Sequence, residues 1–257
     1  MRNTYSFKSS ISPGSVFTVF AFLAVMCSLQ EIMAQDAADV LRKMDDVVFA
    51  GEDQTSGIRL IMTDRSGNER VREAKVWQKG SNKRLFRFTS PAAEAGIAFL
   101  SLPDDVMYLY MPAYGRERRI ATHVRNQSFA GTDFSYEDLE ALRYSERFEA
   151  SIAEEKDNHY ILRLVPLPGT RSDYSEIIVT INREHYYPER MKSFDRGGQE
   201  YKIADYRFER KGDYWTTTEI RMTNLKRQHS TRMIFDDIEF DTGLDDDIFT
   251  VRNLTRY

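Results

Sequence analysis

The sequence predicts a mainly β protein, an antiparallel barrel or sandwich of about ten or eleven strands. Segments rich in β-branched and aromatic residues follow one another, with turn residues about every eight to twelve positions. Hydrophobic residues make up 41% of the chain and charged residues 30%, a balance that favours sheets with one face in water. No repeat, low-complexity stretch or long linker divides the 257 residues, so one domain is expected after an N-terminal leader.

The leader, Met1–Ala34, has the features of a cleaved secretory signal peptide. Arg2 and Lys8 supply positive charge near its start. The apolar stretch Val16–Met26 that follows is too short to span a bilayer comfortably. Ala34 is the small residue before the expected cleavage point.

Two alternatives exist for this leader: a membrane anchor, and a lipoprotein leader whose lipidated residue is Cys27. Lipoprotein leaders resemble one another in having Gly, Ala or Ser directly before the lipidated cysteine, whereas the residue before Cys27 is the bulky Met26. Cleavage is therefore favoured over a lipid anchor and leaves a mature domain over residues 35–257. Because Cys27 is the one cysteine of the chain, no disulfide and no thiolate chemistry is expected in that domain.

After the leader, Asp36–Phe49 has the pattern of an amphipathic helix. Its apolar residues recur at intervals of three and four, and they are Val40, Leu41, Met44, Val47 and Val48. Gly51 ends the segment. We expect this helix to lie with its apolar face on the sheet that follows.

Alternating apolar and polar residues then predict strands in both halves of the chain. The first alternation is Ile58, Leu60 and Met62, and Arg65–Asn68 follows it as a hairpin turn. The other expected strands, outside the central segment, are Val71–Trp77, Lys83–Thr89, Ile97–Leu102, Arg143–Glu154, Tyr160–Pro166, Ile177–Ile181, Tyr187–Phe194, Tyr201–Glu209, Tyr214–Asn224 and His229–Phe240.

The central segment, Asp104–Glu140, organises the rest of the chain. Val106–Met111 is apolar or aromatic on both faces, so this strand should be covered on both sides. A turn leads to a more polar strand over Arg116–Val124, and a loop centred on Gly131 follows. The last piece, Ser135–Leu142, has a serine N-cap and two acidic residues in its first turn, which predicts a short helix.

Residue types that carry chemistry are sparse. A net charge of −4 argues against nucleic acid as a partner. The four histidines lie far apart in sequence, which gives no metal-site spacing, and they are His123, His159, His185 and His229. No nucleophile motif or phosphate loop occurs, and Asp241–Asp247 lacks the spacing of a calcium loop. The sequence thus predicts no enzyme, metal or cofactor. The alternative is an active site formed by carboxylates that are scattered in sequence and meet only in the folded protein.

The remaining signal is a set of apolar residues that recurs on the strands. Core packing is the simpler interpretation. The alternative is a ligand cavity, because barrels of this strand number are wide enough to hold a ligand, and methionines adapt to varied acyl chains. The candidate cavity residues are Phe86, Phe88, Phe99, Met107, Leu109, Met111, Ile177, Val179, Met191 and Met222.

The central segment also carries a family resemblance. Its stretch SFAGTDFSYEDL, preceded by YLYMP, resembles the hallmark segment of the LolA-like outer membrane lipoprotein-sorting proteins. The motif residues are Ser128, Phe129, Gly131, Asp133, Phe134, Tyr136 and Asp138. Ala130 departs from the pattern, in which a larger apolar residue is usual. A weaker likeness extends through Tyr214–Asn224, His229 and Ile248–Thr250.

The resemblance implies a half-open antiparallel β-barrel with a helical lid over an apolar cavity, in a monomeric protein of the bacterial periplasm. It implies a chaperone-like carrier that binds acyl chains of lipoproteins or lipids for sorting to the outer membrane. The alternative is a non-enzymatic periplasmic module that docks onto an inner-membrane lipid or RND-type transporter. Four arginines are candidates for its docking face, Arg116, Arg118, Arg119 and Arg125, unless they guard a solvated strand edge against aggregation.

Overall fold

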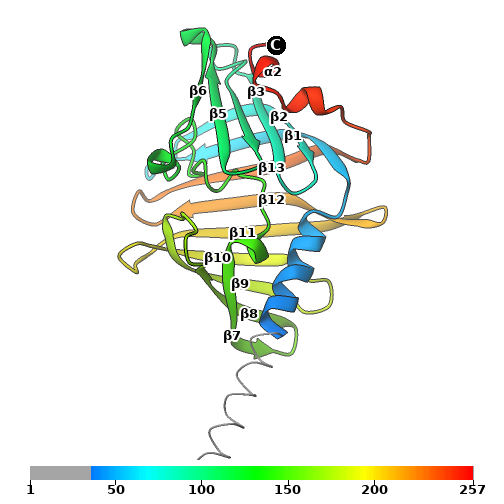
Figure 1. Cartoon of the computed structure of the whole chain (residues 1–257). Coiled ribbons are helices and arrows are strands. Elements are labelled where there is room, and N and C mark those ends of the chain that lie inside the picture. Colours follow the sequence, from blue (N-terminus) through cyan, green and yellow to red (C-terminus); the bar gives the residue numbers. More distant parts are fainter. Residues whose placement is uncertain (1–35, 257) are drawn as a thin grey trace, which may run out of the picture.

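The computed structural model describes residues 36–256 and contains one sheet of thirteen antiparallel strands in the order β6-β5-β4-β3-β2-β1-β13-β12-β11-β10-β9-β8-β7 (Figure 1). The expected leader, including Cys27, lies outside the described residues. The strands are β1 Asp53–Thr63, β2 Glu69–Lys79, β3 Lys83–Ser90, β4 Ala98–Leu102, β5 Val106–Met111, β6 Arg116–Arg119, β7 Phe148–Lys156, β8 His159–Pro166, β9 Tyr174–Asn182, β10 Pro188–Asp195, β11 Glu200–Lys211, β12 Tyr214–Asn224 and β13 His229–Phe240.

The prediction of a mainly β, half-open antiparallel architecture is confirmed, but the expected number of strands was too low. The sheet curves without closing, because β6 and β7 are its two free edges. Within it, neighbouring strands pair in register, as where Ile58 of β1 lies opposite Ala74 of β2 and Phe235 of β13. The short strands β4 and β6, of five and four residues, are hard to count separately from sequence.

The two edge strands are joined by residues 120–147, here called the strap. Since β6 and β7 lie at opposite edges of the sheet, the strap must cross from one edge to the other. It brings the apolar residues Phe129, Phe134, Tyr136 and Leu139 into the same core as the strands. Its only regular pieces among the described residues are the 3-10 turns η2, Thr122–Val124, and η3, Tyr144–Glu146.

The N-terminal helix spans residues 36–48 and is drawn in blue in Figure 1, where it lies across the sheet. Its residues Val40, Leu41 and Met44 are buried in the core, as the amphipathic pattern predicts. No helix of the described residues is both long and apolar enough to cross a membrane.

The second predicted helix, Ser135–Leu142, is wrong: the structure has only turns there. The N-cap does form, because the Ser135 hydroxyl oxygen accepts from the Asp138 N–H at 3.3 Å and the Ser135 N–H donates to Asp138 Oδ2 at 2.7 Å. However, Asp138 is also held by Lys202 of β11. Residues 141–143 then have no regular secondary structure before η3, so the helix stops after one capped turn.

A second, smaller core lies on the other face of β3, β4 and β5. The 3-10 turn η4, Asp246–Phe249, and the short helix α2, Val251–Leu254, cover this face. Tyr110 of β5 is buried there, while Met107 of the same strand is buried in the main core. The prediction that Val106–Met111 is covered on both sides is therefore confirmed. Another 3-10 turn, η1, Pro112–Tyr114, links β5 to β6.

Candidate functional site

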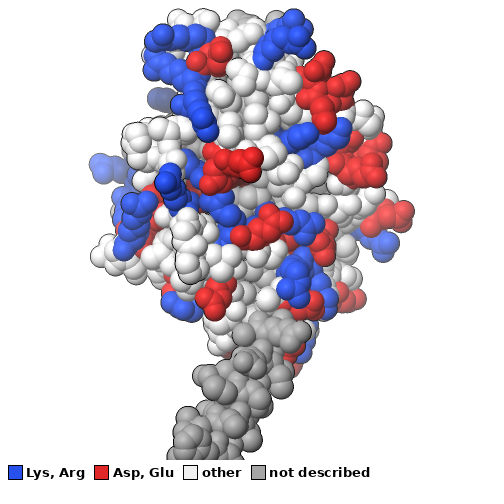
Figure 2. All heavy atoms as spheres, in the orientation of Figure 1, with Lys and Arg blue, Asp and Glu red and all other residues white. Residues whose placement is uncertain are grey.

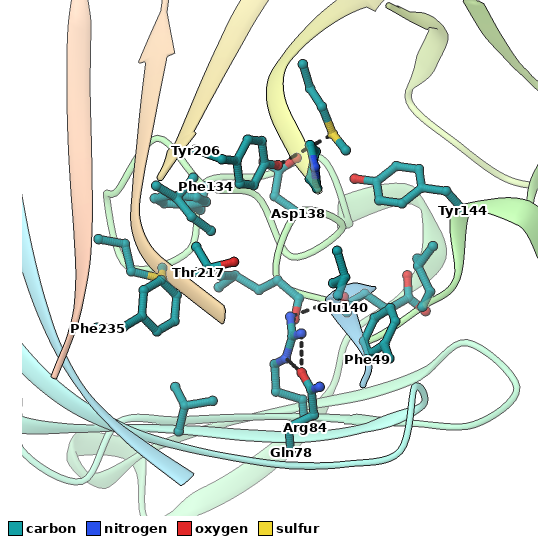
Figure 3. Close-up of a pocket in the computed structure, with 18 of the residues that line it drawn as sticks. Phe49, Gln78, Arg84, Phe134, Asp138, Glu140, Tyr144, Tyr206, Thr217 and Phe235 are labelled. Atoms are coloured by element: carbon teal, nitrogen blue, oxygen red, sulfur yellow. Dashed lines mark hydrogen bonds between the residues drawn. The ribbon is translucent and has the colours of Figure 1, made fainter. Parts of the chain in front are cut away.

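A cavity of about 170 Å³ lies between the N-terminal helix, the strap and the concave face of the sheet (Figure 3). Most of its wall is apolar or aromatic, and residues from β1, β2, β3 and β9 to β13 contribute. Figure 3 shows Phe134, Tyr206, Tyr144 and Phe235 around this space. A largely apolar chamber with a few polar groups on its wall is the usual form of a small-molecule site.

Three of the ten candidate cavity residues line this space, Phe86, Ile177 and Met191. The other seven are not on its wall. Phe88, Phe99, Met107, Val179 and Met222 are buried within the core, Leu109 packs against that core, and Met111 is half-buried on β5. Most of the ten candidate residues therefore pack in the core, and the cavity lies beside them on the concave face.

Phe129 of the strap fills the space above β3 and β4. Its ring lies 5.3 to 5.9 Å, centre to centre, from four other aromatic rings, those of Phe86, Phe88, Phe99 and Tyr136. Aromatic pairs at such separations add attraction to the area they bury. The strap thus closes one end of the half-barrel with a solid aromatic cluster and leaves the cavity beside it.

The remaining motif residues build the strap itself. Ser128 and Ser135 form an isolated antiparallel bridge. The turn between them has positive φ at both Ala130 and Gly131, 48° and 79°. Glycine adopts that conformation without the steric cost that a Cβ brings, so Gly131 suits its position in this turn. Phe134, just after the turn, points into the cavity wall.

Asp133 fastens the strap to β13. Its Oδ2 accepts from the Thr231 hydroxyl at 2.8 Å and lies 2.6 Å from His229 Nδ1, while its backbone N–H donates to Thr231 Oγ1. The Thr231 hydroxyl bonds the carboxylate rather than the imidazole, which is not the order of a nucleophile–base–acid triad. We interpret the group as a buried clasp.

Asp138 fastens the strap to the opposite half of the sheet. Its carboxylate lies 2.6 Å from Lys202 Nζ and accepts from the hydroxyl of Tyr174. Burial opposes ionisation, but the Lys202 charge and the hydrogen bonds prevail and hold the pKa of Asp138 below its usual value. The pair is therefore an ion pair at neutral pH.

A second buried pair joins Arg125 and Glu140, whose side chains are both only 4% exposed. Burial raises the pKa of Glu140 to about 7, against the attraction of Arg125 and Arg147. Arg125 also lies 3.5 Å from Asp105. The hypothesis that Arg125 belongs to an exposed basic face is therefore wrong, because its guanidinium is buried and paired with Glu140.

Sequence reasoning missed the polar groups that line the cavity, above all Arg84 and Gln78. Arg84 Nε donates to Gln78 Oε1 at 3.0 Å, and Nη1 donates to the backbone oxygens of Leu139 and Glu140 (Figure 3). The sequence does contain a signal for Arg84. It alternates with Phe86 and Phe88 on one face of β3, so an arginine occupies an inward position of that strand.

No group of three or more His, Cys, Asp or Glu side chains within residues 36–256 has an arrangement that would hold a metal ion. The polar groups at the cavity are instead hydrogen-bond donors and paired charges. Chemically, the site offers an apolar chamber with one cationic corner.

A family model described as an uncharacterized protein matches residues 80–256, and no curated protein matches the chain. Three solved structures are similar. A domain assigned to the outer membrane lipoprotein-sorting proteins, from Vibrio parahaemolyticus, is 24% identical with a TM-score of 0.80, over 87% of this chain and 100% of its own. A DUF1329 family protein from Desulfovibrio piger is also 24% identical, with a TM-score of 0.81 over 86% and 99%.

A LolA superfamily protein from Nitrosomonas europaea is 20% identical, with a TM-score of 0.71 over 83% of this chain and 97% of its own. At these identities the likeness establishes the fold, and it agrees with the resemblance of the strap motif. The chain therefore belongs to the family of uncharacterized proteins matched over residues 80–256, and it has the LolA-like fold of outer membrane lipoprotein-sorting proteins.

Proposed function

We propose that this protein is a non-enzymatic periplasmic carrier that binds acyl chains of lipoproteins or lipids in its cavity, for sorting to the outer membrane. The observation that carries the proposal is the largely apolar chamber enclosed by the sheet, the strap and the N-terminal helix. The names of the structural neighbours support the same role. The secretory features of Met1–Ala34 support export.

The size of the cavity limits what it holds at rest. An engineered apolar cavity of about 150 Å³ accepts a benzene molecule, so a chamber of about 170 Å³ takes about six carbon atoms. Burying six methylenes contributes about 5 kcal/mol, which corresponds to a weak complex with a Kd in the submillimolar range. Tighter binding of a long acyl chain needs more space, which movement of the strap or the N-terminal helix would provide.

The proposal is tested on protein isolated from the periplasmic fraction of an expressing bacterium. Native mass spectrometry and titration with a fluorescent acyl lipid should both detect bound lipid. Thr217→Trp, which fills the cavity, should abolish uptake. Its control is Thr218→Trp, because Thr218 is the neighbouring residue but does not line the cavity. Absence of uptake by the unmodified protein would overturn the carrier role.

A second candidate function is docking onto an inner-membrane lipid or RND-type transporter. It is favoured by β6, an edge strand of sequence RERR whose four residues are all exposed. In Figure 2, blue basic atoms gather at the end of the molecule where β6 lies. Next to it, Tyr114 is 60% exposed and the Arg118 guanidinium lies 5.2 Å from its ring centre.

A pull-down from solubilised inner membranes separates the two functions. Docking predicts that a transporter is retained by the native protein and lost when Arg116, Arg118 and Arg119 are replaced by serine. Lipid uptake should then be unaffected, because these residues do not line the cavity. Retention that does not depend on the three arginines would remove this candidate.

A further inference from the structure

Arg84 is a cation at the cavity wall that has no acidic partner. Its Nε and Nη2 both donate to Gln78 Oε1, and its Nη1 donates to the backbone oxygens of Leu139 and Glu140 at 3.1 and 3.3 Å. Every one of these acceptors is electrically neutral. Among the residues that the structure describes, no carboxylate forms an ion pair with this guanidinium.

The acceptor on the Nε–Nη2 edge is the informative one. This edge of a guanidinium is a fork that suits the two oxygens of a carboxylate. Here a single amide oxygen, that of Gln78, serves both donors. Because a carboxylate would form two charge-assisted bonds in its place, Gln78 is an acceptor that an anion would displace.

The other two cations close to the cavity, Arg125 and Lys202, already have acidic partners. Asp138 is paired with Lys202, and Glu140 with Arg125. Glu137, a further carboxylate on the wall, accepts from the Ser172 hydroxyl and the Asp173 N–H rather than from Arg84. Arg84 is thus the one cation of this set whose hydrogen-bond acceptors include no carboxylate.

Burial also makes that charge costly. It lowers the pKa of Arg84 to about 10, against the attraction of nearby groups such as Glu140. A partly buried cation whose hydrogen-bond acceptors are all neutral gains from a counterion more than an exposed one does, because water screens it less.

From Arg84, the cavity wall continues as apolar side chains. Phe86 lies two residues along β3, and Ile220, Met233 and Phe235 line the same space from β12 and β13. Figure 3 shows Arg84 and Gln78 on one side of the cavity and Phe235 and Phe134 around the rest. A ligand that complements both the Arg84 guanidinium and the apolar wall has an anionic head and a hydrocarbon tail.

We propose that the cavity binds the free carboxylate of a fatty acid, with the carboxylate in place of Gln78 on Arg84 and the tail along the apolar wall. This inference rests on the proposed function and narrows it. It distinguishes a free acid from the ester- or amide-linked chains of a lipoprotein, which present no carboxylate at that position.

Isothermal titration calorimetry at pH 8 with octanoate and octan-1-ol tests the inference, since the two ligands share a tail and differ in head charge. We expect octanoate to bind the native protein about tenfold more tightly than octanol. Equal affinities would overturn the free-acid inference and leave the carrier role standing. Binding of neither ligand, together with no uptake of the fluorescent lipid, would overturn both.

Variants at Gln78 sharpen the test without removing Arg84. Gln78→Glu supplies a carboxylate of the same size from within, so the tenfold preference for octanoate should disappear while octanol still binds. Gln78→Met, of similar volume and no charge, should keep the preference. The inference is overturned if Gln78→Glu still prefers octanoate or if Gln78→Met loses the preference.

A second pair of variants removes a positive charge from either face of β3. Arg84→Met should lose the preference for octanoate. Arg87→Met should keep it, because Arg87 Nη2 donates to the backbone oxygen of Asn253 on the opposite side of the sheet. Equal effects of the two variants would mean that net charge rather than the Arg84 site selects the acid. Circular dichroism of each variant checks that it folds.

Discussion

The Asp138 carboxylate of the strap lies 2.6 Å from the Lys202 ammonium of β11, and both side chains are at most 10% exposed. Asp138 thereby joins a connection that starts at one edge of the sheet to a strand from the other half. Together with the Asp133 clasp on β13, it holds the strap over the concave face at two points.

The two partners of the Asp138–Lys202 pair should be strongly coupled in their effect on stability. Lys202→Met leaves a buried carboxylate without its counterion, and such losses cost about 3–5 kcal/mol. The double variant Asp138→Asn with Lys202→Met should cost clearly less than the sum of the single variants. Urea unfolding of the four proteins measures this coupling, and additive effects would contradict it.

The aromatic cluster around Phe129 should contribute much of the strap's stability. Phe129→Ala removes a fully buried ring that contacts four others, and such truncations cost about 3–5 kcal/mol. Tyr114→Ala, at an exposed position, is the control and should stay within about 0.5 kcal/mol of the native protein. Comparable losses in both variants would show that the cluster is not a packed core.

Asp45 should control how firmly the N-terminal helix is tied to the strap. Its buried carboxylate accepts from the backbone N–H groups of Tyr144 and Ser145, at 3.0 and 2.8 Å. Asp45→Asn removes one acceptor oxygen, so the amides of these two residues should exchange hydrogen faster. Bound lipid should exchange faster too.

The control for this prediction is Asp46→Asn, because the neighbouring Asp46 is exposed and forms only a surface ion pair with Arg143. Hydrogen exchange read by mass spectrometry should leave the peptide around Tyr144 unchanged in that variant. Unchanged exchange in Asp45→Asn would rule out this tie as a constraint on opening.

Asp53 should make the attachment of the C-terminal segment dependent on pH and weaker in acid. Its carboxylate accepts from the N–H and hydroxyl of Thr242 and from the N–H of Leu244. Burial opposes ionisation, but these hydrogen bonds hold the pKa of Asp53 below its usual value of 3.8. The stabilisation is therefore present above that pH and is lost as the pH falls through the lower pKa of the folded protein.

Asp53→Asn should accordingly destabilise the protein by about 1–3 kcal/mol at pH 7. The difference from the native protein should begin to shrink below about pH 4, where Asp53 of the unfolded chain becomes protonated, and shrink further as the pH falls through the lower pKa of the folded state. Urea unfolding between pH 3 and pH 7 measures both quantities. A difference that stays constant over this range would mean that Asp53 acts only through its shape.

Local sequence patterns were sufficient for the strands. The alternation of Ile58, Leu60 and Met62 places all three in buried positions of β1, as period-two burial requires. The helix over residues 36–48 likewise follows from its three-to-four spacing. These predictions succeed because the burial of one face depends on the order of residues along a single element.

The strap was less predictable, because its conformation depends on distant partners. Ser135 and Asp138 form the reciprocal cap of a helix, but Lys202 and Tyr174 bind Asp138 from other strands and the helix does not continue. Likewise, Arg125 looks in sequence like one more member of an arginine-rich edge. Only its burial beside Glu140, fifteen residues away, separates it from Arg116, Arg118 and Arg119.

By itself the sequence determined a mainly β architecture, a barrel or a sandwich, because hydrophobic period and turn chemistry are local properties, and the family resemblance of residues 128–139 added the half-open form. The tertiary structure alone decided which apolar side chains pack solidly and which border open space. Phe86 touches both Phe129 and the cavity, while Phe88, two residues further along β3, is enclosed in the cluster. That distinction arises from where the strap comes to rest, and the position of a long connection is set by contacts between residues far apart in the chain.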